Sequence, residues 1–267
     1  MKKKIAIVLS IMLAAGTFIA CGKKAEKTDL AKIKEKGEMV VGLDDTFVPM
    51  GFKDEKGDIV GFDVDLAAEV AKKIGVKVKF QPIDWSMKES ELTGGKIDVI
   101  WNGYSISDER KEKVAFSKPY LENKQVIITL ANSPVNTKAD LKGKAVAAQN
   151  GSTAVDAVEK EADLLKSFKD GKLVTFETNN DALMDLEAGR VDAVVGDEIL
   201  IRYFTAQRGE SKYKVLDENF GTEEYGVGFR KEDKEFLAAV QKALDEMKAE
   251  GTSKKISEKW FGKDIVK

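Results

Sequence analysis

The alternation of short β-branched runs with longer helical patterns constrains the fold of this sequence more than any other feature. Residues 38–44 (EMVVGLD) read as a strand, and residues 62–74 read as a helix with one apolar face that Gly75 ends. Strands that alternate with helices form parallel sheets covered by helices, so we expect an α/β fold. The same reading predicts strands over residues 77–83, 98–101, 145–149, 173–177, 192–195 and 225–230, and helices over 153–166, 181–188, 199–205 and from 233 onward.

Two distant stretches repeat one pattern. Residues 92–100 (LTGGKIDVI) and 186–194 (LEAGRVDAV) each read as a helix end, a glycine cap, a basic residue and a buried strand. Many α/β proteins use this helix-to-strand pattern, so the repeat alone leaves open whether it has further meaning. If it does, the chain forms two similar lobes, each with a strand end at a shared cleft, where open α/β sheets bind ligands.

The N-terminus reads as an export signal over residues 1–20, with three lysines followed by an uncharged, mostly apolar run too short to span a bilayer. Ala20 precedes Cys21, the single cysteine of the chain, and this junction resembles the lipobox of bacterial lipoproteins, although Phe18 stands where Leu is usual. The resemblance implies that Cys21 carries a diacylglycerol with palmitate-type chains, and that residues 21–37 are the lipid anchor and tether. The alternative is a free thiol without a role.

Composition excludes several classes of function. Three of the 44 Lys and Arg residues lie in residues 1–20, which leaves 41 basic against 46 acidic residues in the exported chain. Mixed charges with a mild acidic excess give no reason to expect a nucleic-acid partner. The sequence has no histidine, which rules out histidine-dependent catalysis and removes the preferred metal ligand, so we expect no catalytic residue, metal or cofactor.

The first copy of the repeat runs into residues 101–111 (WNGYSISDERK), and residues 114–120 (VAFSKPY) follow. Here the chain resembles the polar amino-acid solute-binding proteins of ABC importers, the bacterial extracellular solute-binding protein family 3, of the lipoprotein type. That family carries a G-x-[ST]-[IV]-[ST]-x-x-R segment before an F-S-x-P-Y segment. The resemblance extends over about residues 40–261, through residues 46–49 (TFVP), 61–66 (GFDVDL), 84–85 (DW), 150–153 (NGST), 225–229 (YGVGF) and 259–262 (KWFG).

The resemblance implies a two-lobe periplasmic-binding-protein-like fold with two hinge crossings. Lobe 1 is expected over residues 38–122 plus 218–267, and lobe 2 over residues 126–214, with crossings near 121–125 and 216–221. It implies a monomer, held on the extracytoplasmic face of the cell membrane through Cys21, that captures a free polar amino acid by lobe closure. The partner that receives the amino acid is an ABC importer permease.

An amino acid is a zwitterion, and its burial requires a cation for the carboxylate and an anion for the ammonium. Arg110 suits the carboxylate because its planar guanidinium forms two parallel bonds. Asp197 suits the ammonium, with Ser105 and the Gly103 carbonyl beside it. The alternatives are a solvated residue at a helix start for Arg110 and a helix N-cap for Asp197.

The remaining candidates line the site around these two charges. Phe47 and Trp85 are expected to form aromatic walls, although Trp85 could equally be core. Asp44, next to Asp45 at a strand end, suggests a polar or cationic ligand side chain, with Lys, Arg or Gln favoured, but acids are also common in turns. Other expected ligand contacts are Asn102, Gln149, Ser152 and Thr153, the last two in a strand-to-helix turn that can bind an anion.

Two other functions remain open at the level of sequence. An enzyme on the same scaffold, such as a dehydratase acting on an arogenate-like acid, needs a buried carboxylic acid, and Glu198 and Glu224 are the candidates. An extracellular sensor domain or freestanding sensor accessory is the third reading.

Overall fold

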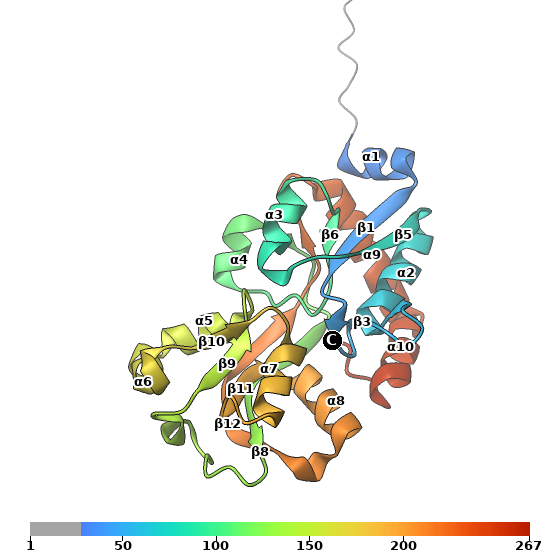
Figure 1. Cartoon of the computed structure of the whole chain (residues 1–267). Coiled ribbons are helices and arrows are strands. Elements are labelled where there is room, and N and C mark those ends of the chain that lie inside the picture. Colours follow the sequence, from blue (N-terminus) through green and yellow to red (C-terminus); the bar gives the residue numbers. More distant parts are fainter. Residues whose placement is uncertain (1–27) are drawn as a thin grey trace, which may run out of the picture.

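The computed structural model describes residues 28–267, so the export signal, Cys21 and most of the tether lie outside the described residues. Two lobes are visible, each built on a five-stranded sheet with helices on both faces (Figure 1). The α/β two-lobe prediction is confirmed. Among the described residues, no helix has both the length and the apolar character that a membrane span requires.

The sheet of lobe 1 has the strand order β5-β1-β6-β13-β7. Its interior strand β1 is buried along nearly its whole length and runs parallel to β5 and β6, as expected for a strand with helices on both sides. Strand β13 returns late in the sequence and pairs antiparallel with β6 and β7. The strands are β1 (Glu38–Leu43), β5 (Lys77–Pro82), β6 (Val99–Ile100), β7 (Ala115–Phe116) and β13 (Gly228–Phe229).

Helices cover both faces of this sheet (Figure 1). Helix α2 has the predicted bounds, Phe62–Ile74, and Gly75 ends it with a positive φ of 86°, from which its N–H reaches two carbonyls of the last turn. A small sheet of β2 (Thr46–Phe47), β3 (Gly51–Lys53) and β4 (Ile59–Val60) lies before α2. The other helices of lobe 1 are α1 (Asp29–Lys36), α3 (Lys88–Thr93), α4 (Asp108–Lys113), α9 (Lys234–Ala249) and α10 (Thr252–Phe261), with the 3-10 turn η1 (Trp85–Met87) before α3.

The sheet of lobe 2 has the order β10-β9-β11-β8-β12, with β9 parallel to β10 and β11 and with β8 antiparallel to both of its neighbours. Its strands are β8 (Leu121–Leu130), β9 (Val146–Gln149), β10 (Val174–Phe176), β11 (Ala193–Asp197) and β12 (Tyr213–Tyr225). Its helices are α5 (Thr153–Lys160), α6 (Ala162–Ser167), α7 (Asn179–Glu187) and α8 (Glu198–Arg208), with 3-10 turns η2 (Lys138–Leu141), η3 (Lys169–Gly171) and η4 (Glu210–Lys212).

The long strands β8 and β12 connect the lobes. They pair with each other up to Leu121 and Tyr225, where the Tyr120 N–H donates to the Tyr225 carbonyl at 3.0 Å and Ser105 of lobe 1 forms a bridge with Tyr225. The sequence predicted two extended crossings here but not that they belong to continuous strands. The predicted strand 225–230 is wrong at its start, because Tyr225 ends β12 and β13 begins only at Gly228.

The single helix predicted over residues 153–166 is wrong, because the chain forms α5 and α6 with a break between them. Glu161 leaves the helical region, with φ −94° and ψ 57°. Its N–H donates to the Val158 carbonyl, and its carboxylate pairs with Lys138 from a distant turn. A tertiary contact therefore fixes a bend that local propensity does not indicate.

The sequence repeat is also a structural repeat. Gly95 and Gly189 both adopt positive φ, 73° and 69°, after α3 and α7. The Asp98 carboxylate then accepts the N–H of Val40 in lobe 1 at 2.8 Å, and the Asp192 carboxylate accepts the N–H of Ala145 in lobe 2 at 2.8 Å. In each lobe, the aspartate that follows the glycine turn therefore bonds to the backbone of a neighbouring segment of the chain.

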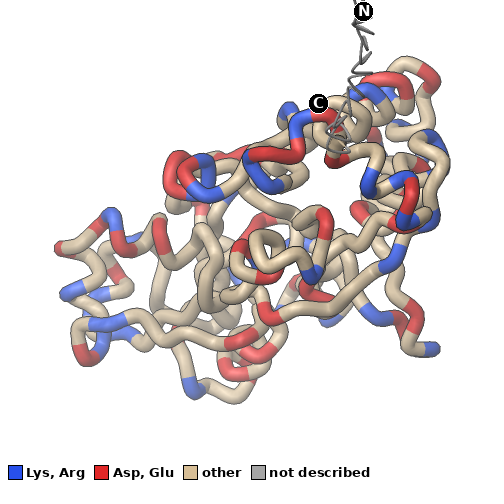
Figure 2. Tube along the Cα trace, turned by 90° about the horizontal axis from the view of Figure 1, so that it is seen from above, with Lys and Arg blue, Asp and Glu red and all other residues tan. Residues whose placement is uncertain are grey.

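Charged residues of both signs are spread over the two lobes (Figure 2). This distribution agrees with the near balance of 44 basic and 46 acidic residues in the sequence.

Candidate functional site

The eleven predicted ligand-binding positions lie together where the two lobes meet, and all are buried. The side chains other than that of Gly103 have exposed fractions of 1–8%. Asp44 of lobe 1 accepts a bond from the Gln149 amide of lobe 2 at 2.7 Å, and the Thr153 hydroxyl donates to Ser105 at 3.3 Å. Carboxyl ends of strands from both lobes therefore supply one buried polar region.

Arg110 enters this region from α4, whose first turn is capped by the Ser107 hydroxyl. Its side chain is 4% exposed, so the alternative of a solvated residue at a helix start is wrong. The guanidinium donates to the carbonyls of Ser105 at 2.9 Å and Gly151 at 3.1 Å, and it lies over the ring of Tyr104. None of the ion pairs within residues 28–267 involves Arg110, so its charge has acceptors but no carboxylate.

Asp197 ends β11 on the side of lobe 2. It occupies the N-cap position of α8, as the alternative expected, but its side chain forms no capping bond. Its Oδ1 instead accepts bonds from the Tyr225 hydroxyl at 2.7 Å, from Gln125 at 3.2 Å and from the amide of Asn123. Burial, reinforced by the nearby charge of Glu223, raises the pKa of Asp197 to about 8.

Sequence reasoning missed the residues that surround Asp197. Glu223 of β12 accepts bonds at Oε1 from Ser105 at 2.6 Å, Gln125 at 2.7 Å and Asn123 at 2.8 Å. A signal for two of them was present, because Asn123 and Gln125 occupy alternate positions of β8 that face inward with Leu121. Polar residues at inward positions of a crossing strand indicate a polar site.

The two aromatic candidates, Phe47 and Trp85, lie on the lobe 1 side of the site. Gly103 adopts a φ of +56°, and a Cβ there would lie 2.7 Å from the Phe47 ring and 3.2 Å from Tyr225. Glycine is therefore required for this close approach. Trp85 packs edge-on against Tyr104 within a hydrophobic cluster, so it belongs to the core as well as to the site boundary.

Asp44 and Asn102 form the end of the region next to Gln149. Burial raises the pKa of Asp44, although its carboxylate accepts bonds from the backbone and hydroxyl of Thr46. The Asn102 oxygen accepts the Asp44 N–H at 3.1 Å, while its buried amide nitrogen has no hydrogen-bond partner. Asp45 points away and pairs with Lys53, so only Asp44 of the two acids faces the site.

The turn at residues 150–153 leads from β9 into α5. Ser152 precedes the helix but makes no capping bond, and its hydroxyl donates to the Gln149 carbonyl at 2.7 Å. The Thr153 hydroxyl accepts a bond from the Gln125 amide at 3.2 Å.

Lys88 is a second cation that the sequence analysis missed. It is 3% exposed, and its Nζ donates to the carbonyls of Trp85 at 3.0 Å and Gly151 at 2.8 Å. Burial and the nearby Arg110 lower the pKa of Lys88 to about 8. Two cations of lobe 1 therefore bond to one carbonyl of lobe 2. No sequence signal marks this contact, since Lys88 begins a short helix that carries several charged residues.

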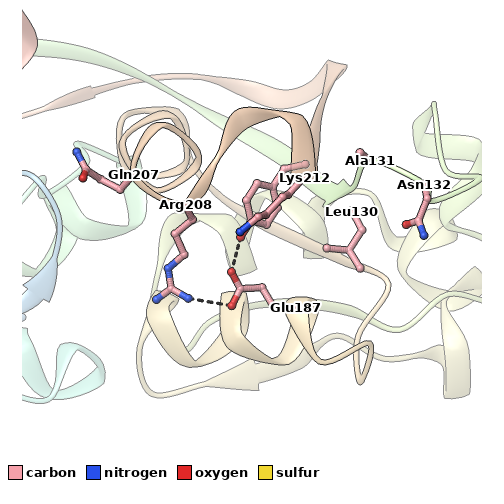
Figure 3. A pocket seen from close by; sticks show the side chains of 8 residues that line it. Leu130, Ala131, Asn132, Glu187, Gln207, Arg208 and Lys212 are labelled. Carbon is pink, nitrogen blue, oxygen red and sulfur yellow. Dashed lines mark hydrogen bonds and ion pairs between the residues drawn. The ribbon is translucent and has the colours of Figure 1, made fainter.

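A separate pocket lies on lobe 2 and is lined by residues of β8, α7, α8 and η4 (Figure 3). Glu187 in this pocket bonds to Arg208 at 2.8 Å, as a dashed line shows, and it also bonds to the Tyr213 hydroxyl. None of the eleven predicted ligand-binding residues lines it.

Residues 39–263 match the family described as bacterial extracellular solute-binding proteins, family 3. The chain belongs to this family. Its relatives include the L-cystine-binding protein TcyJ of Escherichia coli, which is 33% identical over 262 residues, 97% of this chain and 95% of the relative.

Solved structures of similar proteins agree with this assignment. A substrate-binding protein of an ABC uptake transporter from Streptococcus pneumoniae, solved with bound histidine, has a TM-score of 0.87 and 40% identity over 89% of this chain and 98% of that one. An ancestral arginine-binding protein, solved with arginine and with glutamine, has a TM-score of 0.78 and 44% identity over 85% of this chain and 99% of that one.

The family assignment confirms the predicted resemblance and decides against the enzyme alternative, because the family and the relatives are solute-binding proteins and not enzymes. The two acids considered for catalysis lie in surface ion pairs, Glu198 with Arg202 at 3.0 Å and Glu224 with Lys267.

Proposed function

We propose that this family 3 solute-binding protein captures a free polar amino acid between its lobes and delivers it to the permease of an ABC importer. The supporting observation is the placement of complementary charges on opposite lobes, with Arg110 on lobe 1 and Asp197 on lobe 2. Arg110 has no carboxylate partner among the described residues, and Asp197 has no basic one. The carboxylate of an amino acid would pair with Arg110, and its ammonium would pair with Asp197.

Lobe closure would couple capture to a change of shape. We assign lobe 1 to residues 38–122 plus 218–267 and lobe 2 to residues 126–214, with β8 and β12 as the hinge between them. A ligand that contacts Arg110 and Asp197 at the same time binds fully only when the lobes meet, so it favours the closed state.

The ligand side chain would lie toward Asp44, Asn102 and Gln149, with Phe47 and Trp85 as walls. The buried carboxylate of Asp44 favours a side chain that donates, such as Lys, Arg or Gln, and the unpartnered amide donor of Asn102 suits an acceptor such as the Gln oxygen. The ancestral relative solved with arginine and with glutamine supports the same choice. Ser105, Ser152, Thr153 and the backbone of Gly103 would hold the main-chain groups of the ligand.

A thermal-shift panel of the common amino acids against the protein without residues 1–20 tests this proposal. A ligand at a hundred times its dissociation constant adds about 2.7 kcal/mol of stability, which raises the melting temperature by a few degrees. We expect a shift with one or a few polar amino acids. If no amino acid shifts the melting temperature, the proposal is wrong.

Asp44→Asn tests the assignment of the side-chain pocket. If the ligand is cationic, we expect its affinity to fall roughly 10-fold, because a charge-assisted bond is replaced by a neutral one. The control is Asp45→Asn, which removes the neighbouring outward-facing acid. Titration calorimetry measures both, and unchanged affinity for a cationic ligand in Asp44→Asn would overturn this part of the proposal.

We further propose that Cys21 carries a diacylglycerol that holds the protein, as a monomer, on the extracytoplasmic face of the cell membrane. This residue lies outside the described residues, and the proposal depends on its place after the export signal. Two acyl chains give stable anchoring where one does not. Cys21→Ser should release the protein from washed membranes, and retention of this variant in the membrane fraction would contradict the assignment.

A further inference from the structure

The hinge strands place a second acid beside Asp197. Strand β8 lies between β11 and β12, and its inward-facing amides are each opposite an acid on a neighbouring strand. Gln125 is paired in register with Asp197 of β11, and Asn123 is paired in register with Glu223 of β12. Two acids from different strands therefore flank two amides of the middle strand.

Both amides bridge both acids. The Asn123 nitrogen donates to Asp197 and to Glu223, the second at 2.8 Å. The Gln125 nitrogen donates to Glu223 at 2.7 Å and to Asp197 at 3.2 Å, and the Thr153 oxygen lies at 3.2 Å from the same nitrogen. Three oxygens thus surround one amide nitrogen, which carries two hydrogens, whereas an ammonium carries three. The arrangement of oxygens suits an ammonium better than an amide.

The charges of this cluster do not balance among the described residues. None of the ion pairs within residues 28–267 includes Asp197 or Glu223. Asp197 is buried and Glu223 is half-buried, and two carboxylates that share donors disfavour a full negative charge on both, which favours a proton on the buried Asp197. The raised pKa of Asp197, with burial as its main cause and Glu223 next, agrees with a bound proton at neutral pH.

Other charged and titratable groups face this pair from the elements around it. Arg110 of α4 opposes the raised pKa of Asp197, and Tyr225 of β12 donates to Asp197. The pocket that Glu223 lines from β12 also includes charged side chains of α4 and α5, namely Asp108, Glu109, Asp156 and Lys160. Three of these four are acidic, so this surrounding set does not supply the missing positive charge.

We propose that Glu223 is a second carboxylate of the ammonium site and that Asp197, with Glu223 beside it, holds one proton until the ligand ammonium replaces it. On binding, the O–H bond of this proton at Asp197 breaks, the proton leaves to solvent, and N–H groups of the ammonium donate hydrogen bonds to the two carboxylates. Glu223 also accepts a bond from Ser105 of lobe 1 at 2.6 Å. Binding of the ammonium at Glu223 therefore also affects the contact between β12 and lobe 1. This inference rests on the proposed amino-acid binding.

Titration calorimetry with the amino acid found in the thermal-shift panel tests the inference. Titrations at pH 7 in buffers of different ionisation enthalpy measure the protons released per ligand bound. We expect about one proton for the unaltered protein and clearly less for Glu223→Gln, because the neighbouring negative charge that favours the proton on Asp197 is then absent. The matched control is Glu224→Gln on the same strand, because Glu224 pairs at the surface with Lys267, and it should release as many protons as the unaltered protein.

The dissociation constant of the unaltered protein should also fall by up to about tenfold per pH unit between pH 5.5 and 7.5, because the proton competes with the ligand. This profile decides the inference even if Glu223→Gln does not fold. Ligand binding without proton release and with a flat pH profile would overturn it, and so would equal release by a folded Glu223→Gln. If no amino acid binds the unaltered protein, the proposed function itself fails.

Discussion

The buried ionisable groups of the two lobes, Arg110 and Asp197, are stabilised in different ways. Lobe 1 supplies Arg110, whose guanidinium donates to backbone carbonyls at 2.9 and 3.1 Å. Lobe 2 supplies Asp197, which amides and a tyrosine surround and whose raised pKa of about 8 favours its neutral form. A buried cation that cannot lose its proton needs acceptors, whereas a buried acid can take up a proton. Under the proposed function, each lobe therefore stabilises its own half of the zwitterion site.

The largest effect is expected from the cation side. Arg110→Ala should lower the affinity for the amino acid on the order of 100-fold or more, because a buried ligand carboxylate loses its partner. Arg202→Ala, which removes an exposed arginine paired with Glu198, is the control and should bind normally. Titration calorimetry gives both constants, and near-normal affinity in Arg110→Ala would show that another group holds the carboxylate.

On the acid side, Asp197→Asn should weaken binding roughly 10- to 100-fold, because the ammonium then meets a neutral amide.

In the absence of amino acid, the same substitution should raise the free energy of unfolding at high pH, relative to that of the unaltered protein. The pKa of Asp197 in the folded state, about 8, lies above the ordinary value of 3.8, so the folded state holds a proton that the unfolded state releases. The stability due to Asp197 is therefore present below pH 4 and is lost as the pH rises to 8.

Urea unfolding of the ligand-free proteins at pH 5 and pH 8 measures this difference. The free energy of unfolding of Asp197→Asn, relative to that of the unaltered protein, should be higher at pH 8 than at pH 5. An equal difference at the two pH values would contradict the proposed neutral form of Asp197.

The smallest effect is expected from Lys88, the second cation that bonds to Gly151 across the lobes. Lys88→Met should weaken ligand binding roughly 3- to 10-fold at pH 6, because one charge-assisted bond of the closed state is lost. The pKa of Lys88 is lowered to about 8, so the difference from the unaltered protein should narrow at pH 9. Lys96→Met, at an exposed lysine paired with Glu91, is the control. A difference that does not change with pH would exclude a role for the charge of Lys88.

Local patterns predicted the elements and residues that short stretches of sequence determine. Helix α2 was predicted with its bounds because an apolar face and a C-terminal glycine define it within thirteen residues. The eleven predicted ligand-binding positions fall in motifs at strand ends, and the structure brings them together, while their contact with a ligand stays a prediction.

Glu223 was missed because long-range pairing decides its direction. Strand β12 has register shifts on both sides of Asn219, so its alternation cannot be read from the sequence, and only the pairing with β8 places Glu223 opposite Asn123 and Glu224 opposite Glu122. Lys88 was missed for a similar reason, since its contact with Gly151 comes from the other lobe.

The central claim is that each lobe binds one charged group of a free amino acid. The most direct measurement is calorimetric titration of the unaltered protein with the amino acid found in the panel, with its methyl ester and with its N-acetyl derivative. We predict at least about 100-fold weaker binding for each derivative, because each leaves one buried charge, Arg110 or Asp197, without its partner. Binding of either derivative within about threefold of the free amino acid would contradict the account.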